Sequence, residues 1–263
     1  DEAVARQSEP RVGARAAEGE ARLLAGQNGR QVVRLAAPAA FRGREGWPPA
    51  PCLAYVERVV REQGNSSRAS FVAASADSLH GVDDAGIDVV TTRSVLIYVK
   101  EKCAAFDAFF RVLRPGGRIS LAEPINGDYL ALNACADEYY GYRVPAVADV
   151  LARLRRDDED GADRDDHPMT GFNHVDLVRH SEAAGFRESH LELRIDVAAR
   201  DPRAWDSFVN FVPNPNAPTI GETFRETLSA DEVRRLESSL RPLVEQSLGR
   251  ERTSMAYLWA IKE

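Results

Sequence analysis

The chain has 263 residues and a formal net charge of −7, and 44% of its residues are hydrophobic. This length suits one α/β domain of the larger kind, and no apolar run approaches the roughly 18 residues that a membrane-spanning helix needs. The negative charge gives no overall attraction to a phosphate backbone. We therefore expect no nucleic acid and no membrane as a partner, and a small molecule fits better.

The three cysteines, Cys52, Cys103 and Cys135, lie far apart and lack the paired spacing of a zinc site or a disulfide framework. We expect them to be reduced thiols in a cytoplasmic protein. The chain begins at Asp1 with neither an initiator Met nor a signal segment, so we expect upstream residues to be missing. No pattern indicates an oligomeric state.

The first 51 residues differ from the rest. They are rich in Ala, Arg, Gly and Pro, and only Gln31 to Ala37 has the composition of a strand. We interpret residues 1–51 as irregular, and one hypothesis is an out-of-frame translation of a GC-rich gene, because shifted reading of such DNA yields this composition. The regular α/β domain is then expected at residues 52–263.

Regular patterning begins at Cys52. The apolar spacing predicts a helix from Cys52 to about Gln63, where Gly64 ends it. Phe71–Ala74 has the pattern of a short buried strand, and the loop that follows leaves the carboxyl end of that strand. Ile87–Thr91 has the pattern of a second strand.

A longer helix is predicted from about Lys102 to Leu113, because one apolar stripe runs along it. The stripe, at i, i+3, i+4 and i+7, consists of Phe106, Phe109, Phe110 and Leu113. Proline and glycine in Arg114–Gly117 end the helix and turn the chain, so Arg118–Glu123 is expected to be the next strand. Strand, helix and strand in this order indicate a right-handed parallel crossover, the unit of a doubly wound sheet.

Two segments after Pro124, residues 127–170 and 200–228, lack this regularity. We expect them to fold over the carboxyl edge of the sheet as a cap that determines specificity. Between them, the patterns predict a helix at Val175–Ala184 and a half-buried strand at Leu191–Val197.

Two further elements follow the second insert. Ser229 and Glu232 have the spacing of a capping box, which predicts a helix that continues to Val244. Met255–Ile261 is apolar at nearly every position, so we expect a strand buried on both faces.

The segment Phe71–Pro124 resembles the second half of class I S-adenosylmethionine-dependent methyltransferases. It carries an acidic loop after a strand, an Asp-Val-Val strand that ends in a polar tripeptide, and the run Arg-Val-Leu-Arg-Pro-Gly-Gly-Arg before the next strand. The resemblance implies a doubly wound, Rossmann-like α/β fold with a seven-stranded sheet and helical cap inserts. It also implies S-adenosylmethionine as the cofactor and methyl transfer to a small-molecule acceptor.

The resemblance places the cofactor across the carboxyl ends of the strands. The adenine is expected beside the loop after the first predicted strand, which consists of Ser75, Ala76 and Asp77. The methionine moiety and the transferable methyl are expected beside the three residues after the second, which are Thr92, Arg93 and Ser94. Asp77 can equally be a turn cap, and Arg93 can equally be one partner of a surface ion pair.

Two features of the family are missing from the sequence. The glycine-rich loop of the pattern Asp/Glu-x-Gly-x-Gly-x-Gly, which lets the backbone approach the cofactor, does not occur. The acidic residue that holds the ribose hydroxyls is also missing, since Pro49–Pro51 stands before the first helix. We therefore expect weakened cofactor binding and impaired activity. A non-catalytic, methyltransferase-like binding protein and a nicotinamide-dependent oxidoreductase are the alternatives.

No catalytic residue stands out from the sequence. His174 is one candidate for a general base, but the histidines share no ligand spacing and the acidic run Asp157–Asp166 fails the spacing of a calcium loop. We expect no metal site. The tyrosine cluster at Tyr139–Tyr142 is expected to pack in a core or lid, or else to line the substrate pocket.

Overall fold

The computed structural model describes residues 32–36, 49–64, 66, 69–159, 167–213 and 217–263. These residues form an α/β structure, as the sequence predicts. The largest sheet, which we call the main sheet, has four strands. In spatial order they are β3 (Ile87–Arg93), β4 (Leu113–Pro124), β8 (Arg250–Ile261) and β7 (Glu188–Ala199).

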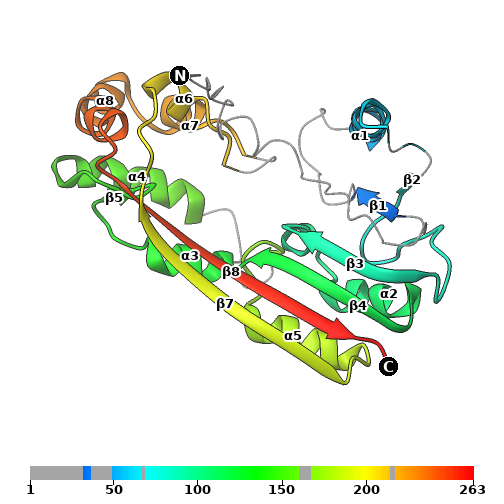
Figure 1. Cartoon of the computed structure of the whole chain (residues 1–263). Coiled ribbons are helices and arrows are strands. Elements are labelled where there is room, and N and C mark those ends of the chain that lie inside the picture. The colour runs from blue at the N-terminus through cyan, green and yellow to red at the C-terminus, as the bar shows by residue number, and fades with distance from the viewer. Residues whose placement is uncertain (1–31, 37–48, 65, 67–68, 160–166, 214–216) are drawn as a thin grey trace, which may run out of the picture.

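The main sheet is mixed. β3 and β4 are parallel and are joined by α2 (Lys102–Val112), so the predicted strand, helix and strand order is confirmed. β8 lies between β4 and β7 and is antiparallel to both (Figure 1). The carboxyl ends of β3 and β4 therefore lie at the same edge of the sheet as the start of β8.

Two glycines let β4 follow α2 directly. Gly116 has a φ of 77°, a region that glycine adopts without Cβ strain. A Cβ on Gly117 would lie 2.8 Å from the carbonyl oxygen of Arg114 and 3.1 Å from those of Ile87 and Asp88. Glycine is therefore required at these two positions near the start of β4, which begins at Leu113 and includes the residues that the sequence predicts as a turn.

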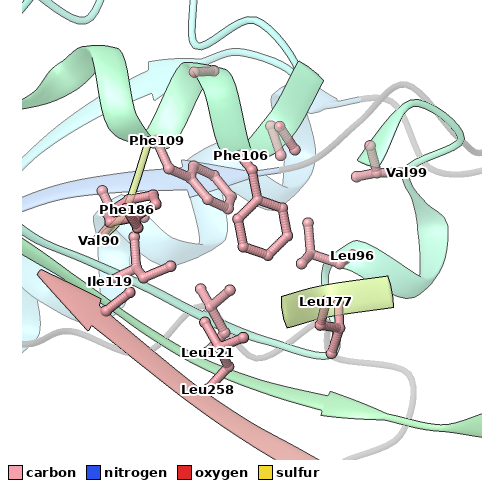
Figure 2. Close-up of a cluster of buried hydrophobic side chains, with 14 of the residues drawn as sticks. Val90, Leu96, Val99, Phe106, Phe109, Ile119, Leu121, Leu177, Phe186 and Leu258 are labelled. Carbon is pink, nitrogen blue, oxygen red and sulfur yellow. The ribbon is translucent and has the colours of Figure 1, made fainter. Parts of the chain in front are cut away.

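The core of the main sheet lies on one of its faces, under α2 and α5 (His174–Ala183). Figure 2 shows Phe106 and Phe109 of α2 among the side chains of this core, together with Ile119 of β4. Both phenylalanines are fully buried, which confirms the predicted stripe. Phe110 is only partly buried and meets the ring of Phe186 edge-on, with 5.1 Å between ring centroids.

The opposite face of the main sheet is exposed. Val89 of β3 and Tyr257 and Trp259 of β8 are 38%, 41% and 42% exposed. No helix within the described ranges covers them. The expectation that Met255–Ile261 is buried on both faces is therefore wrong, because its side chains alternate between the core and this open face.

A separate parallel pair precedes the main sheet. It consists of β1 (Val32–Ala36) and β2 (Ala69–Ala73), joined by α1 (Pro49–Glu62). β1 lies in the stretch Gln31–Ala37, which has the composition of a strand. The strand predicted at Phe71–Ala74 and the helix predicted from Cys52 are confirmed, although β2 begins at Ala69 and α1 begins three residues before Cys52. No hydrogen-bonded ladder joins β2 to β3 within the described residues, so they do not form a single seven-stranded sheet. Most of the predicted irregular segment 1–51 lies outside the described residues.

The loop after β2 is nevertheless attached to the main sheet. Arg111 of α2 donates hydrogen bonds to the backbone carbonyls of Ser78 at 3.0 Å, Leu79 at 3.2 Å and Val82 at 3.0 Å. Leu79 also belongs to the core under α2. This loop is thereby held beside the main sheet although its strand is not part of that sheet.

The two predicted cap inserts contribute to one helical layer, which we call the cap. Its main elements are the hairpin β5 (Glu138–Tyr139) and β6 (Tyr142–Arg143), with α4 (Ala148–Glu159), α6 (Trp205–Val209), α7 (Ile220–Thr227) and α8 (Ala230–Glu245). They share a second hydrophobic core, in which Tyr142 is fully buried. The capping box predicted at Ser229 and Glu232 is confirmed and begins α8, which packs in the same core. Figure 1 shows the cap beside the end of β7 and the start of β8. The carboxyl ends of β3 and β4 point toward the same side of the molecule.

The described helices include none that is both long and apolar enough to cross a lipid bilayer.

Candidate functional site

The candidate site is the edge of the main sheet where β3 and β4 end side by side. Arg93 is paired with Ala122 in the register of the two strands, and the backbone N–H of Ser94 donates to the carbonyl of Ala122 at 2.9 Å. Ser94 has a φ of 54°, so the chain turns sharply there. Beyond it, the 3-10 helix η2 (Leu96–Tyr98) leads toward α2.

Glu123 organises this edge, and the sequence analysis did not identify it. Its carboxylate is 0% exposed. One oxygen accepts from the hydroxyl of Thr92 at 2.7 Å and from the backbone N–H of Val95 at 3.2 Å, and the other accepts from the N–H of Leu96 at 3.0 Å. The available sequence signal was the alternation of β4, because Glu123 follows Ile119 and Leu121 on the same face of the strand, where a charge is costly unless it is hydrogen-bonded.

Lys102 is a second buried charge near this edge. Its ammonium group donates to the carbonyl of Val99 at 2.9 Å and to that of Pro168 at 2.7 Å, and it lies 4.3 Å from the ring centroid of Phe172. The segment that follows β3 is therefore attached at both ends, to β4 through Glu123 and to the loop before α5 through Lys102.

Burial shifts both of these groups toward their neutral forms. It raises the pKa of Glu123 from 4.5 to about 7, although the hydrogen bonds from Thr92 and the loop amides oppose the rise. It lowers the pKa of Lys102 from 10.5 to about 8, and the negative charges of Glu123 and Glu101 oppose that change. The pKa of Tyr98 is also raised, first by burial and then by the charge of Glu123.

These shifts predict that Glu123 and Lys102 together contribute least to the stability of the protein between about pH 7 and pH 8. The raised pKa of Glu123 contributes stability that is complete below pH 4.5 and is lost as the pH rises to about 7. The lowered pKa of Lys102 contributes stability that is complete above pH 10.5 and is lost as the pH falls to about 8. In urea titrations, the free energy of unfolding of wild type should fall by about 3 kcal/mol relative to that of Glu123→Gln from pH 4.5 to 7, and should rise above pH 8 relative to that of Lys102→Met.

The Glu123→Gln and Lys102→Met variants separate the two contributions. Glu123→Gln should remove the fall in the free energy of unfolding below pH 7 and keep its rise above pH 8. Lys102→Met should keep the fall below pH 7 and remove the rise above pH 8. A fall of equal size in wild type and Glu123→Gln would assign the pH dependence to other groups.

The loop after β2 provides the other three predicted cofactor residues. The carbonyl of Ser75 accepts from the N–H of Leu79 at 2.9 Å, which closes a turn. Ala76 is buried in the same core as Leu96 of η2, and Asp77 is partly exposed. The loops that carry the two predicted trios are thus anchored in one hydrophobic core, and contact of either trio with a cofactor stays a prediction.

His174 is the first residue of α5, beside the capping box that Asn173 and Asp176 form. Its Nδ1 is buried and has no hydrogen-bond partner in the described part of the chain. Its role as a base stays a prediction. The described residues contain no group of three or more His, Cys, Asp or Glu side chains that could hold a metal ion.

Comparisons with known proteins agree with the resemblance. Residues 49–121 match the profile of a family described as methyltransferase domain. The ubiquinone/menaquinone biosynthesis C-methyltransferase UbiE of Erwinia tasmaniensis is 31% identical over 94 residues, which is 36% of this chain and 37% of that protein. The UbiE of a Marinomonas species is 32% identical over 90 residues, which is 34% and 36% of the two chains. The chain thus matches little more than a third of the length of these relatives.

Among solved structures, the YcgJ protein of Bacillus subtilis aligns with a TM-score of 0.48 and 12% identity, over 89% of this chain and 83% of that one.

Residues 49–121 therefore carry the match to a methyltransferase domain, and this match supports the class I, S-adenosylmethionine-dependent type that the sequence motifs resemble. The match begins at Pro49 and ends at Leu121.

Proposed function

We propose that the chain transfers a methyl group from S-adenosylmethionine to a small-molecule acceptor, with cofactor affinity weakened by the missing glycine-rich loop and ribose acid. The main support is the arrangement at the carboxyl ends of β3 and β4, where Glu123 holds Thr92 and the loop beyond it. Thr92, Arg93 and Ser94 would then border the methionine moiety, and Ser75, Ala76 and Asp77 the adenine. A cytoplasmic location is part of the proposal.

The cofactor supplies an activated methyl group, so the protein has to bind, orient and exclude water. Holding two reactants in line can supply roughly 7 to 11 kcal/mol of the barrier reduction in favourable cases. The cap lies on the side of the molecule toward which the carboxyl ends of β3 and β4 point (Figure 1). This position suits it to enclose an acceptor beside those strand ends. The names of the UbiE relatives describe C-methyl transfer in ubiquinone and menaquinone biosynthesis, which favours a small organic acceptor.

Calorimetry with S-adenosylhomocysteine tests the proposed cofactor site. Each charge-assisted hydrogen bond to the ribose contributes about 1.5 to 3 kcal/mol, so losing two weakens binding by about two decades or more. We expect one site per chain with a dissociation constant weaker than about 100 μM. A constant near 1 μM would show that other residues replace both missing motifs.

The same titration separates the alternatives. The interrupted sheet between β2 and β3 favours a non-catalytic, methyltransferase-like binding protein as the second candidate. That candidate predicts no binding of S-adenosylhomocysteine at millimolar concentration. Binding of a nicotinamide dinucleotide instead would support the oxidoreductase alternative.

Arg93→Ala tests the wall beside the methionine moiety. Arg93 is exposed at the end of β3, so its truncation should change the free energy of unfolding by only about 0 to 1 kcal/mol. If the residue borders the cofactor or the acceptor, binding or turnover should fall while the thermal midpoint stays nearly constant. A drop of several degrees with unchanged affinity would make Arg93 a structural residue.

A further inference from the structure

We propose that Glu123 is a positioning residue that fixes the segment Thr92–Leu96 in the conformation needed beside the cofactor. The link to the cofactor rests on the proposed function. The control of the segment's conformation rests on the contacts alone and can be tested without any ligand.

The Glu123 carboxylate takes the place of the N-cap side chain that η2 lacks. Val95 is the N-cap of η2, and its own side chain makes no capping hydrogen bond. The N–H groups at the start of a helix have no partner within it. Those of Val95 and Leu96 instead donate to Glu123, which lies on a strand 27 or more residues further along the chain. A contact across elements therefore sets where η2 begins.

The backbone around these contacts adopts a conformation that needs support. Ser94 has a φ of 54°, which is uncommon for a residue with a Cβ and persists when its surroundings determine it. On its two sides, Thr92 and Val95 donate to the same oxygen of Glu123. The N–H of Ser94 itself donates to the carbonyl of Ala122, the residue before Glu123. The end of β4 thus holds the turn before, at and after Ser94.

A buried carboxylate is a poor means of adding stability to a core. Its desolvation is costly, and a well-packed apolar residue often serves as well. Glu123 is 0% exposed, yet its two oxygens accept hydrogen bonds from Thr92, Val95 and Leu96, which lie within one five-residue segment. This concentration of contacts on one segment indicates positioning of that segment rather than general stabilisation.

The experiment compares Glu123→Gln with Ser181→Ala by amide hydrogen exchange and by calorimetry with S-adenosylhomocysteine. The glutamine keeps the shape of the side chain but replaces one acceptor oxygen with a donor. Ser181 is also 0% exposed and bonds to Ser189 at 2.7 Å, away from the segment, so its variant controls for the loss of a buried polar contact. If Glu123→Gln does not fold, Thr92→Val removes the hydrogen bond from Thr92 to Glu123 and replaces it in the hydrogen-exchange measurement alone, because Thr92 is itself proposed to border the cofactor.

We expect exchange of the Val95 or Leu96 amide to become about tenfold faster in Glu123→Gln, with exchange of the Leu258 amide in β8 unchanged. Thr92→Val should make hydrogen exchange of the Val95 amide severalfold faster. Affinity for S-adenosylhomocysteine should fall about tenfold in Glu123→Gln and stay within about twofold in Ser181→Ala. Equal acceleration at Leu258, as in a global loss of stability, would overturn the proposal.

Two further outcomes are informative. A loosened segment with unchanged affinity for S-adenosylhomocysteine would overturn the positioning role, since the segment would then be irrelevant to the cofactor. Absence of binding in wild type and both variants would refute the proposed function, and the exchange rates alone would then decide whether Glu123 controls the segment.

Discussion

Truncation of Phe109 to Ala should lower the free energy of unfolding by about 3 to 5 kcal/mol. The ring is fully buried under the main sheet and lies 6.0 Å from that of Phe106. Removing it leaves a cavity that the helix and the sheet cannot fill without moving. Urea denaturation followed by circular dichroism measures the loss.

Phe110→Ala is the matched control, because Phe110 is the next residue on the same helix and is only partly buried. Its truncation should cost clearly less. A loss below about 1 kcal/mol for Phe109→Ala, or equal losses for both variants, would contradict the packing of α2 on the main sheet.

Removal of the Glu138 carboxylate should have an effect of similar size. Its side chain is 5% exposed and forms an ion pair with Arg252 of β8, whose side chain is 18% exposed and also donates to Asn133 at 3.1 Å. This pair connects the cap hairpin to the main sheet. Glu138→Ala leaves the guanidinium buried without its counter-charge, so we expect a loss of about 3 to 5 kcal/mol in urea titrations.

Two variants control for this effect. Glu245→Ala removes one partner of an exposed ion pair with Arg241 and should change the free energy of unfolding by at most about 0.5 kcal/mol. The double variant Glu138→Leu with Arg252→Met replaces both charges and should recover much of the stability lost in Glu138→Ala. A double variant as unstable as Glu138→Ala would show that the loss does not arise from an unpaired charge.

Local patterns were sufficient to predict most elements. The apolar stripe of α2, the glycines that follow it and the capping box of α8 each act within a few residues, and the structure confirms all three. The expectation for Met255–Ile261 failed because burial of a strand depends on what covers each face. The composition of the strand carries no information about a missing layer of helices.

The polar part of the site could be predicted only in part. Thr92, Arg93 and Ser94 were proposed from the family resemblance, and the structure places Thr92 and Arg93 at the end of strand β3 and Ser94 directly after it. Glu123 and Lys102 were missed because their partners lie in other elements, so their roles depend on tertiary contacts. For the same reason the sequence did not show that two distant inserts share one core in the cap.

The position of β8 in the sheet has a consequence for synthesis of the protein. β8 follows every other described element in the chain, yet it is hydrogen-bonded to both β4 and β7. Until residues 250–261 have left the ribosome, β4 and β7 have open edges of the kind that invites pairing with other chains. Because these pairings are so distant in sequence, the sheet should assemble slowly and late, and a nascent chain arrested before β8 should depend on chaperones to avoid aggregation.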